Sequence, residues 1–246
     1  MKAFQNGLAK PLDPFSIKSL PKWHPYRALI TLSFRYQEWL AAVKFHTYQL
    51  PRVSPQILQP GHECNPARNT AVSAEQFVVL SQCLAETESL PFPCVEIGSY
   101  RGVTTTFMAS HTKRKVIAID PFIGWGGCDE DMRICLANTR PHQNVCHIRM
   151  TSGSAAAEIA QASFVFIDAV HDYANVRHDL AVYSRKIVSL GIVALHDTDN
   201  PSFAGTRRAV FEFLSNVRSF QLLYHVKDLT VLRNVMRPQH QSVKSG

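Results

Sequence analysis

The hydrophobic positions of this chain change their period along the sequence, and the changes predict alternating strands and helices. Short, mostly apolar runs at residues 94–97, 116–119, 163–167 and 192–195 are typical of strands buried on both faces. Helical spacing follows at 75–89, 103–110, 176–189 and 206–217, and two further strands are predicted at 220–226 and 229–233. This alternation predicts an α/β fold with a doubly wound, mostly parallel sheet that carries helices on both faces.

The first quarter of the chain has a different pattern. Residues 1–25 are rich in proline and lysine and predict an irregular arm, while prolines between 51 and 70 predict a linker. Residues 26–48 lack glycine and proline, and their apolar positions recur every three or four residues, which predicts an amphipathic helix. We therefore expect a basic arm with one helix over residues 1–60 and the main domain over 61–240. The helix could cover a pocket, form a homodimer, lie on a membrane or pack on the main domain.

The composition narrows the class of protein. The chain has 246 residues, of which 46% are hydrophobic and 18% charged, which argues against general disorder. No apolar run approaches the roughly 18 residues that span a bilayer, and the first 20 residues do not resemble a signal peptide. The six cysteines form no CxxC pair, so free thiols and a cytoplasmic location are expected rather than a disulfide or zinc framework.

The net charge of +7 is concentrated at the N-terminal end. Residues 1–60 contain eight lysines and arginines against two acidic residues, a net +6. Such an arm could attract an acidic membrane surface weakly, or meet nucleic acid or an anionic substrate. It could equally be a solvated surface. No nucleic-acid-binding motif accompanies the charge.

A glycine loop follows the first predicted strand of the main domain. The segment from Glu96 through Gly98 and Ser99 to Gly102 has the form acidic-x-Gly-x-x-x-Gly, in which glycines let the backbone approach a ligand closely. It lacks the GxGxxG pattern that cradles a pyrophosphate. An acidic residue at a strand end suits a cationic ligand, such as the ammonium and sulfonium groups of S-adenosylmethionine. Asp120 ends the next strand, where a carboxylate can accept hydrogen bonds from both ribose hydroxyls.

These two segments resemble motifs I and II of class I methyltransferases. The resemblance covers roughly residues 71–233 and implies a Rossmann-like sheet of seven strands that binds S-adenosylmethionine. It implies that Glu96 and the glycines hold the methionine part and that Asp120 holds the ribose. Residues 148–155 resemble the adenine-contact segment of the family, which points to Ser154. Many relatives have Gly-Asp-Ser where this chain has Gly153-Ser154-Ala155.

A second group of polar residues follows two later strands. Asp168 ends the strand at 163–167, and His196 and Asp197 end the strand at 192–195. Because ligands of such sheets bind beyond the carboxyl ends of the strands, these three residues are expected to face one cleft. Carboxylates with an imidazole suit Mg²⁺, Mn²⁺ or another first-row ion. A bound ion could orient two substrate oxygens and lower the pKa of a hydroxyl group.

The same segments are similar to a branch of small-molecule O-methyltransferases, and more narrowly to methyltransferase family 24. In the metal-dependent members an aspartate at the position of Asp168 binds the ion and contributes to catalysis, beside the cofactor. In the catechol type the base is a lysine three residues later, and His171 occupies that place here. Imidazole is a competent base at neutral pH. His196 replaces an acidic residue of the family, and Val170 stands where many relatives have a second aspartate.

Three functions follow as hypotheses. The first is methyl transfer to an oxygen of a small hydroxylated acceptor, such as a sugar or secondary metabolite, with the proton removed in place. The second is a nicotinamide oxidoreductase on the same scaffold, which the missing GxGxxG disfavours. The third is a non-catalytic nucleoside-binding or membrane-recruited protein, which the basic arm would suit. Fold resemblance alone does not decide among them.

Overall fold

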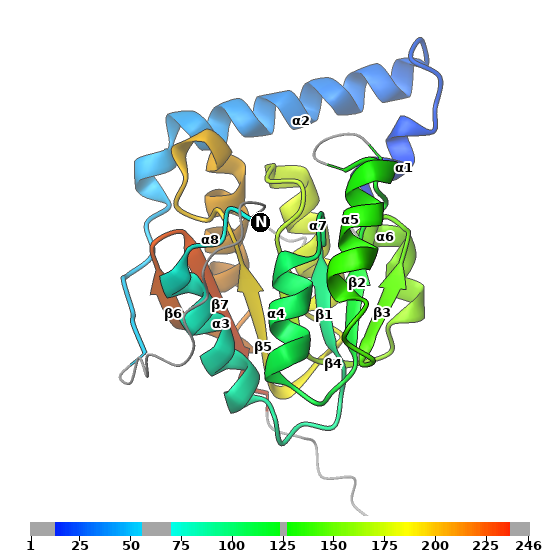
Figure 1. The fold of residues 1–246 in the computed structure, drawn as a ribbon. Coiled ribbons are helices and arrows are strands. Elements are labelled where there is room, and N and C mark those ends of the chain that lie inside the picture. Colours follow the sequence, from blue (N-terminus) through cyan, green and yellow to red (C-terminus); the bar gives the residue numbers. More distant parts are fainter. Residues whose placement is uncertain (1–12, 56–69, 124–126, 237–246) are drawn as a thin grey trace, which may run out of the picture.

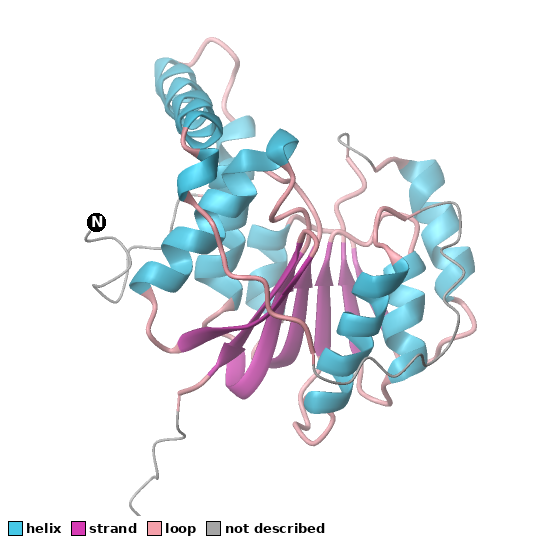
Figure 2. Ribbon diagram, turned by 90° about the vertical axis from the view of Figure 1, so that its left-hand side faces the viewer, coloured by secondary structure: helices cyan, strands magenta, loops and turns pink. Residues whose placement is uncertain are grey.

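The protein is built around one seven-stranded sheet with helices on both faces (Figures 1 and 2). The computed structural model describes residues 13–55, 70–123 and 127–236. The strands lie in the order β3-β2-β1-β4-β5-β7-β6, in which β7 pairs antiparallel with both β5 and β6 and the other neighbours are parallel. Their bounds are β1 (Cys94–Ile97), β2 (Val116–Ile119), β3 (Val145–Ile148), β4 (Ala162–Ile167), β5 (Ile187–Leu195), β6 (Phe220–Val226) and β7 (Leu229–Asn234).

Two sets of helices enclose the sheet. One face carries α3 (Ala74–Glu86), α4 (Val103–His111) and α5 (Asp129–Thr139). The other carries α6 (Ser152–Ala155), α7 (Tyr173–Tyr183) and α8 (Ala204–Asn216). Three short 3-10 segments, η1 (Phe45–Thr47), η2 (Ala156–Glu158) and η3 (Pro201–Phe203), join these elements.

Alternation along the strands builds a separate apolar core on each face. In β1, Cys94 packs with the residues of α3 and α4, whereas Val95 and Ile97 pack with those of α7 and α8. Successive side chains of a strand point to opposite faces, so a sheet covered on both sides needs a continuous apolar run. Glu96 shares the face of Cys94 and is therefore buried beneath α4.

A long N-terminal helix crosses the end of the sheet where the parallel strands finish. This helix, α2 (Pro25–Val43), follows the short α1 (Pro14–Lys18) and lies against α7 and α8 (Figure 1). Its Glu38 accepts a hydrogen bond from the backbone N–H of Tyr173, the first residue of α7. Arg208 of α8 donates to the carbonyl of Gln37 at 3.1 Å. The helix is therefore attached through polar contacts as well as through Ala41, which packs with Phe45 and Ala204.

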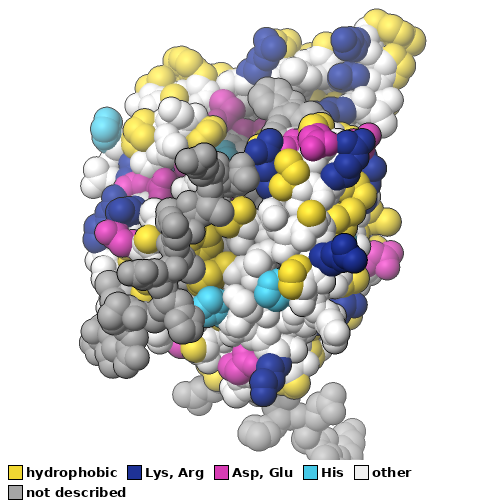
Figure 3. Space-filling view, viewed as in Figure 1, with side chains coloured by type: hydrophobic (Ala, Val, Ile, Leu, Met, Phe, Trp, Pro, Cys, Tyr) yellow, Lys and Arg dark blue, Asp and Glu magenta, His cyan; other side chains and the backbone are white. Residues whose placement is uncertain are grey.

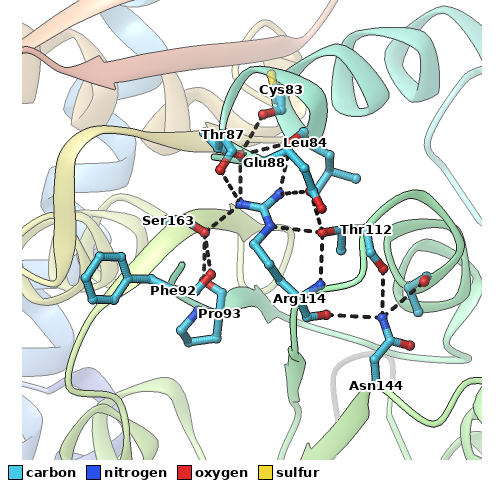
Figure 4. Close-up of polar contacts among 11 residues, drawn as sticks. Cys83, Leu84, Thr87, Glu88, Phe92, Pro93, Thr112, Arg114, Asn144 and Ser163 are labelled. Carbon is cyan, nitrogen blue, oxygen red and sulfur yellow. Dashed lines mark hydrogen bonds and ion pairs between the residues drawn. The ribbon is translucent and has the colours of Figure 1, made fainter. Parts of the chain in front are cut away.

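A buried arginine joins three elements at the opposite edge of the sheet (Figure 4). Arg114, just before β2, donates to the carbonyls of Thr87 at 2.7 Å and Leu84 at 2.9 Å, and to Ser163 Oγ at 2.8 Å. It also forms an ion pair with Glu88 at 3.1 Å. Its Nε donates to the Thr112 hydroxyl at 2.9 Å, so the guanidinium joins the end of α3 to the starts of β2 and β4. This contact stabilises the fold at a distance from the carboxyl ends of the strands.

Most predicted elements are confirmed, including the sheet and its last two strands along the chain, β6 and β7. A capping box between Ser73 and Gln76 begins α3. The predicted helix at 176–189 is wrong at its end, because α7 stops at Tyr183 and β5 begins at Ile187. Gly191, just beyond the predicted end of that helix, lies inside β5. Runs of β-branched residues such as Ile187 and Val188 fit either element by periodicity alone.

Several elements were not predicted. The arm contains α1, and α5 and β3 occupy a stretch whose polar residues obscured the pattern. The division at residue 60 and most of the proline-rich linker lie outside the described residues. Five cysteines are free thiols as expected, and Cys64 lies outside the described part. Within the described chain, every helix is too short or too polar to cross a bilayer.

Candidate cofactor cavity and catalytic cluster

A cavity of about 470 Å³ opens over the carboxyl ends of β1, β2 and β4. Its volume is within the range of small-molecule sites. Of the predicted site residues, Gly98, Ser99, Asp120 and Asp168 line it. These four predicted residues therefore lie together on the wall of the cavity that the strand ends form. Phe15 of α1 lines the cavity as well, so the N-terminal segment contributes to it.

The loop after β1 depends on glycine at two positions. Gly98 has a φ of +91° and Gly102 a φ of +75°, a region that other residues adopt at a cost. A Cβ on Gly98 would overlap the backbone carbonyl of Asp168 and lie 2.9 Å from the Cα of Ala169. Gly102 begins α4 and packs against Cys135 instead of lining the cavity. Gly98 thus brings the backbones of the two loops into direct contact.

Asp120 is held by backbone donors and remains able to accept more. Its Oδ2 accepts from the N–H of Tyr100 at 2.9 Å, and its Oδ1 accepts from that of Phe122 at 2.7 Å. Burial raises the pKa of this carboxyl group, although the backbone hydrogen bonds oppose the shift. Each oxygen keeps acceptor capacity for a further donor. Nearby, the buried Ser99 Oγ has no hydrogen-bond partner among the described residues.

Glu96 is close to the cavity without lining it. It is buried beneath α4 and accepts a hydrogen bond from the Thr105 hydroxyl. Burial raises the pKa of Glu96 to about 8, and the charges of Asp168 and Asp120 add to the shift. A positive ligand above the loop would favour its ionised form. Its role toward the methionine part remains a prediction.

The far end of the cavity contains an acidic residue that the sequence analysis missed. Asp179 of α7 lines this end together with Thr151 and Ser152. The Ser152 hydroxyl donates to Asp179, whose buried Oδ1 has no partner within the described part of the chain. Ser154, predicted to touch the adenine, is exposed and lies outside the lining residues. The available signal was a charged residue on the buried face of α7, between Val176 and Leu180.

The predicted metal and base residues come together beside the cavity. Asp168, His171 and Asp197 each place one potential ligand atom within 4.8 Å of the others. His171 Nε2 lies 3.4 Å from Asp168 Oδ1 and 3.2 Å from Asp197 Oδ2. Asp197 adopts a φ of +54°, which turns its carboxylate toward the cluster at the end of β5. We call Asp168, His171 and Asp197 the catalytic cluster.

His196 contacts the catalytic cluster from the buried side. Its Nδ1 lies 3.4 Å from Asp168 Oδ1 and 3.4 Å from Asp197 Oδ2, and its side chain is buried. Burial opposes a charge here, yet the two carboxylates raise the pKa of His196 to about 10. Burial opposes ionisation of Asp197 as well, yet His196 and His171 lower the pKa of this carboxyl group. His196, expected as a metal ligand, therefore lies against both carboxylates but outside the three residues whose ligand atoms come together.

Comparisons with known proteins agree with this geometry. The model of a methyltransferase domain, family 24, matches residues 95–198. The O-methyltransferase NovP has a similar structure, with a TM-score of 0.58 and 16% identity over 68% of this chain and 83% of NovP. An O-methyltransferase from Bacillus cereus in complex with SAH gives 0.54 and 15% over 82% and 91%. An rRNA methylase from Streptococcus thermophilus gives 0.51 and 15% over 64% and 95%.

At these identities the solved structures show the shared fold, and they include methylases of different substrates. A search with the sequence among curated proteins gave no match. The resemblance expected from the sequence is confirmed by the family match and the strand order together. Residues 95–198 thus match a methyltransferase domain, family 24, and the chain shares its fold with solved methyltransferases.

Proposed function

We propose that the protein transfers a methyl group to a hydroxyl oxygen of a small molecule. The proposal rests on the location of Asp168 between two sites. This residue lines the cofactor cavity, and its carboxylate also belongs to the catalytic cluster with His171 and Asp197. A methyl donor in the cavity and an acceptor at the cluster would therefore meet across one side chain.

The cavity residues fit S-adenosylmethionine. The acceptor capacity of Asp120 suits a ribose diol, and the orphaned Ser99 Oγ is available for a polar group of the ligand. Asp179 and Ser152 would meet the adenine, whose amino group is a donor that matches the free Oδ1. When bound, the cofactor supplies a methyl group on a positively charged sulfur. Glu96 and Asp168 would favour that positive charge from nearby.

The acceptor hydroxyl must lose its proton as the bond to the methyl group forms. His171 Nε2 faces two carboxylates, and the ring of His171 packs on Phe203 with 4.7 Å between centroids. These contacts orient the imidazole so that it can accept the proton, and the carboxylates stabilise the resulting imidazolium. Positioning and proton removal are the two contributions that we assign to this chain.

The same cluster offers a donor set for a divalent ion. Two carboxylates and one imidazole suit Mn²⁺ or another first-row ion better than Mg²⁺, which prefers oxygen ligands. A bound ion would supply Lewis acidity that lowers the pKa of the acceptor hydroxyl. His171 cannot use Nε2 both as a ligand and as the base, so the two assignments are alternatives.

The first test is calorimetric titration of S-adenosylmethionine into the wild type and into the Asp120→Ala variant. Two charge-assisted hydrogen bonds to a ribose contribute about 3–6 kcal/mol together, so the variant should bind at least 100-fold more weakly. The exposed Asp129 of α5 provides a matched control, and Asp129→Ala should bind normally. A folded wild type that does not bind the cofactor would contradict the proposal.

The second test separates catalysis from binding. Catechols, phenols and sugars are screened as acceptors with and without Mn²⁺ or Mg²⁺, using wild type and His171→Gln. We expect His171→Gln to keep cofactor affinity and to lose about 100-fold or more in kcat. A requirement for added metal would assign His171 to the ion, and metal-independent turnover would assign it to the proton. Tight cofactor binding without turnover of any acceptor would favour the non-catalytic alternative.

A further inference from the structure

One face of α2 carries a row of exposed apolar side chains. We call this row the outer face of α2; its residues are Leu29, Leu32, Tyr36, Trp39 and Val43. Each is between 55% and 67% exposed. Tyr26 continues the row into the first turn of α2, and Trp23, which is 81% exposed, lies just before the helix. A contiguous apolar strip of this kind marks an interaction surface.

The helix is attached to the rest of the protein by its opposite side. Ala41 is buried there, Glu38 accepts from the N–H of Tyr173, and the carbonyl of Gln37 accepts from Arg208. Residues three and four apart share a face of a helix, which places Glu38 and Ala41 together and separates them from Tyr36 and Trp39. The outer face therefore points away from the sheet, and no other described element covers it.

The charges around the outer face have one sign. Lys18, Lys22, Arg35 and Lys44 are exposed along α1 and α2. The one carboxylate of α2, on Glu38, is turned inward to α7. In the space-filling view, dark blue and yellow side chains gather along the edge where α2 lies (Figure 3). The surface therefore combines aromatic and aliphatic side chains with basic ones.

We propose that the outer face of α2 docks on the surface of an anionic lipid bilayer. Tryptophan and tyrosine favour the boundary between headgroups and acyl chains, and a helix lying there presents apolar residues inward and basic residues to the headgroups. The exposed lysines and arginines supply the attraction to anionic lipid. This surface is distinct from the cofactor cavity, so the inference does not depend on the proposed reaction.

A second copy of the chain fits the same face less well. The seven-residue spacing of Leu29, Tyr36 and Val43 suits a helical partner. A symmetric antiparallel pair centred on Tyr36 would, however, bring Arg35 close to its own copy. The basic residues at both ends would also face one another without an acidic partner on the outer face. Like charges in such positions disfavour the pairing, whereas anionic headgroups neutralise them.

The test is sedimentation of the full-length protein with vesicles of phosphatidylcholine, with or without phosphatidylserine. The wild type should partition onto the anionic vesicles, and added salt should weaken the binding. The double variant Leu32→Ser with Trp39→Ser should bind the anionic vesicles at least about tenfold more weakly than the wild type. Leu190→Asn is the matched control, because Leu190 is 58% exposed, as Trp39 is, but lies in the first half of β5. It should bind as the wild type does.

A second variant keeps the apolar side chains and changes only the charge. Arg35→Gln with Lys44→Gln should lower binding to anionic vesicles about fivefold for each charge removed. Circular dichroism and cooperative thermal unfolding of each variant show that it is folded. A folded wild type that ignores vesicles, or that binds neutral and anionic lipid equally, overturns the proposal. A dimer in sedimentation that the Leu32 and Trp39 substitutions abolish, without vesicle binding, overturns it in favour of a second copy.

Discussion

Replacing Asp179 with asparagine should stabilise the protein at high pH and leave it nearly unchanged at low pH. Burial raises the pKa of Asp179 to about 7, and the charges of Asp13 and Asp172 add to the shift. An unfolded chain ionises this group near its ordinary value of about 3.9. The folded state therefore binds more protons than the unfolded state between these two values, and stability is lost as the pH rises through the folded pKa.

The magnitude follows from the size of the pKa shift. A difference of about three pKa units corresponds to about 4 kcal/mol, of which about 3 kcal/mol is lost between pH 5 and pH 8. Asparagine carries no charge and keeps an oxygen that can accept from the Ser152 hydroxyl. Relative to the wild type, the free energy of unfolding of the variant should therefore rise by up to about 3 kcal/mol between pH 5 and pH 8. Other titrating groups are the same in both proteins, so their contributions cancel in the comparison.

The assay is urea unfolding of the cofactor-free protein at pH 5, 6, 7 and 8, with the slope m compared between proteins. Asp129→Asn serves as the control, because Asp129 is exposed and pairs with Arg149 on the surface. The free energy of unfolding of this control should stay within about 0.5 kcal/mol of the wild-type value at each pH. An Asp179→Asn effect that is independent of pH, or destabilising at pH 8, would refute the reasoning from burial.

Two further substitutions test the loop after β1 and the arginine that precedes β2. Gly98→Ala adds a Cβ that would overlap the Asp168 carbonyl at a φ of +91°, so it should destabilise the protein by about 2 kcal/mol or more and weaken cofactor binding; thermal unfolding and calorimetry measure both. Arg114→Lys loses most of the donors that join α3, β2 and β4, so it should destabilise by about 3 kcal/mol. Because Arg114 lies far from the strand ends, its cofactor affinity should match that of the wild type. A loss of affinity in Arg114→Lys would contradict this separation of stability from function.

The sequence predicted the strand ends well because local patterns determine them. A short apolar run followed by an acid gave the positions of Asp120 and Asp168, and parallel strands bring such ends to one edge of a sheet. The roles of His171 and His196 could not be separated in this way. Their relative position depends on the loop after β4 and on the unusual backbone of Asp197, which are tertiary features. The same holds for Asp179, whose contact with Ser152 requires α7 to approach α6.

The N-terminal helix shows a second limit of pattern reasoning. Its existence was predicted from an apolar stripe that includes Leu29, Leu32 and Trp39, and such a stripe normally faces the core. In the structure these residues point outward, while Glu38 and Ala41 make the inner contacts. The inner face is held by small and polar groups that periodicity does not score. The pattern therefore located the helix but gave no information on which side would be buried.

The contact between Gly98 and the backbone of Asp168 has a consequence for how the protein could change over evolution. At Gly98, the loop that would hold the methyl donor meets main-chain atoms of the loop that would position the acceptor. The separation of donor and acceptor is therefore independent of most side chains nearby. Substitutions at neighbouring positions such as Val170 could alter the choice of acceptor while the distance between methyl donor and acceptor stays constant. New substrates are accessible to such a scaffold without rebuilding its donor site.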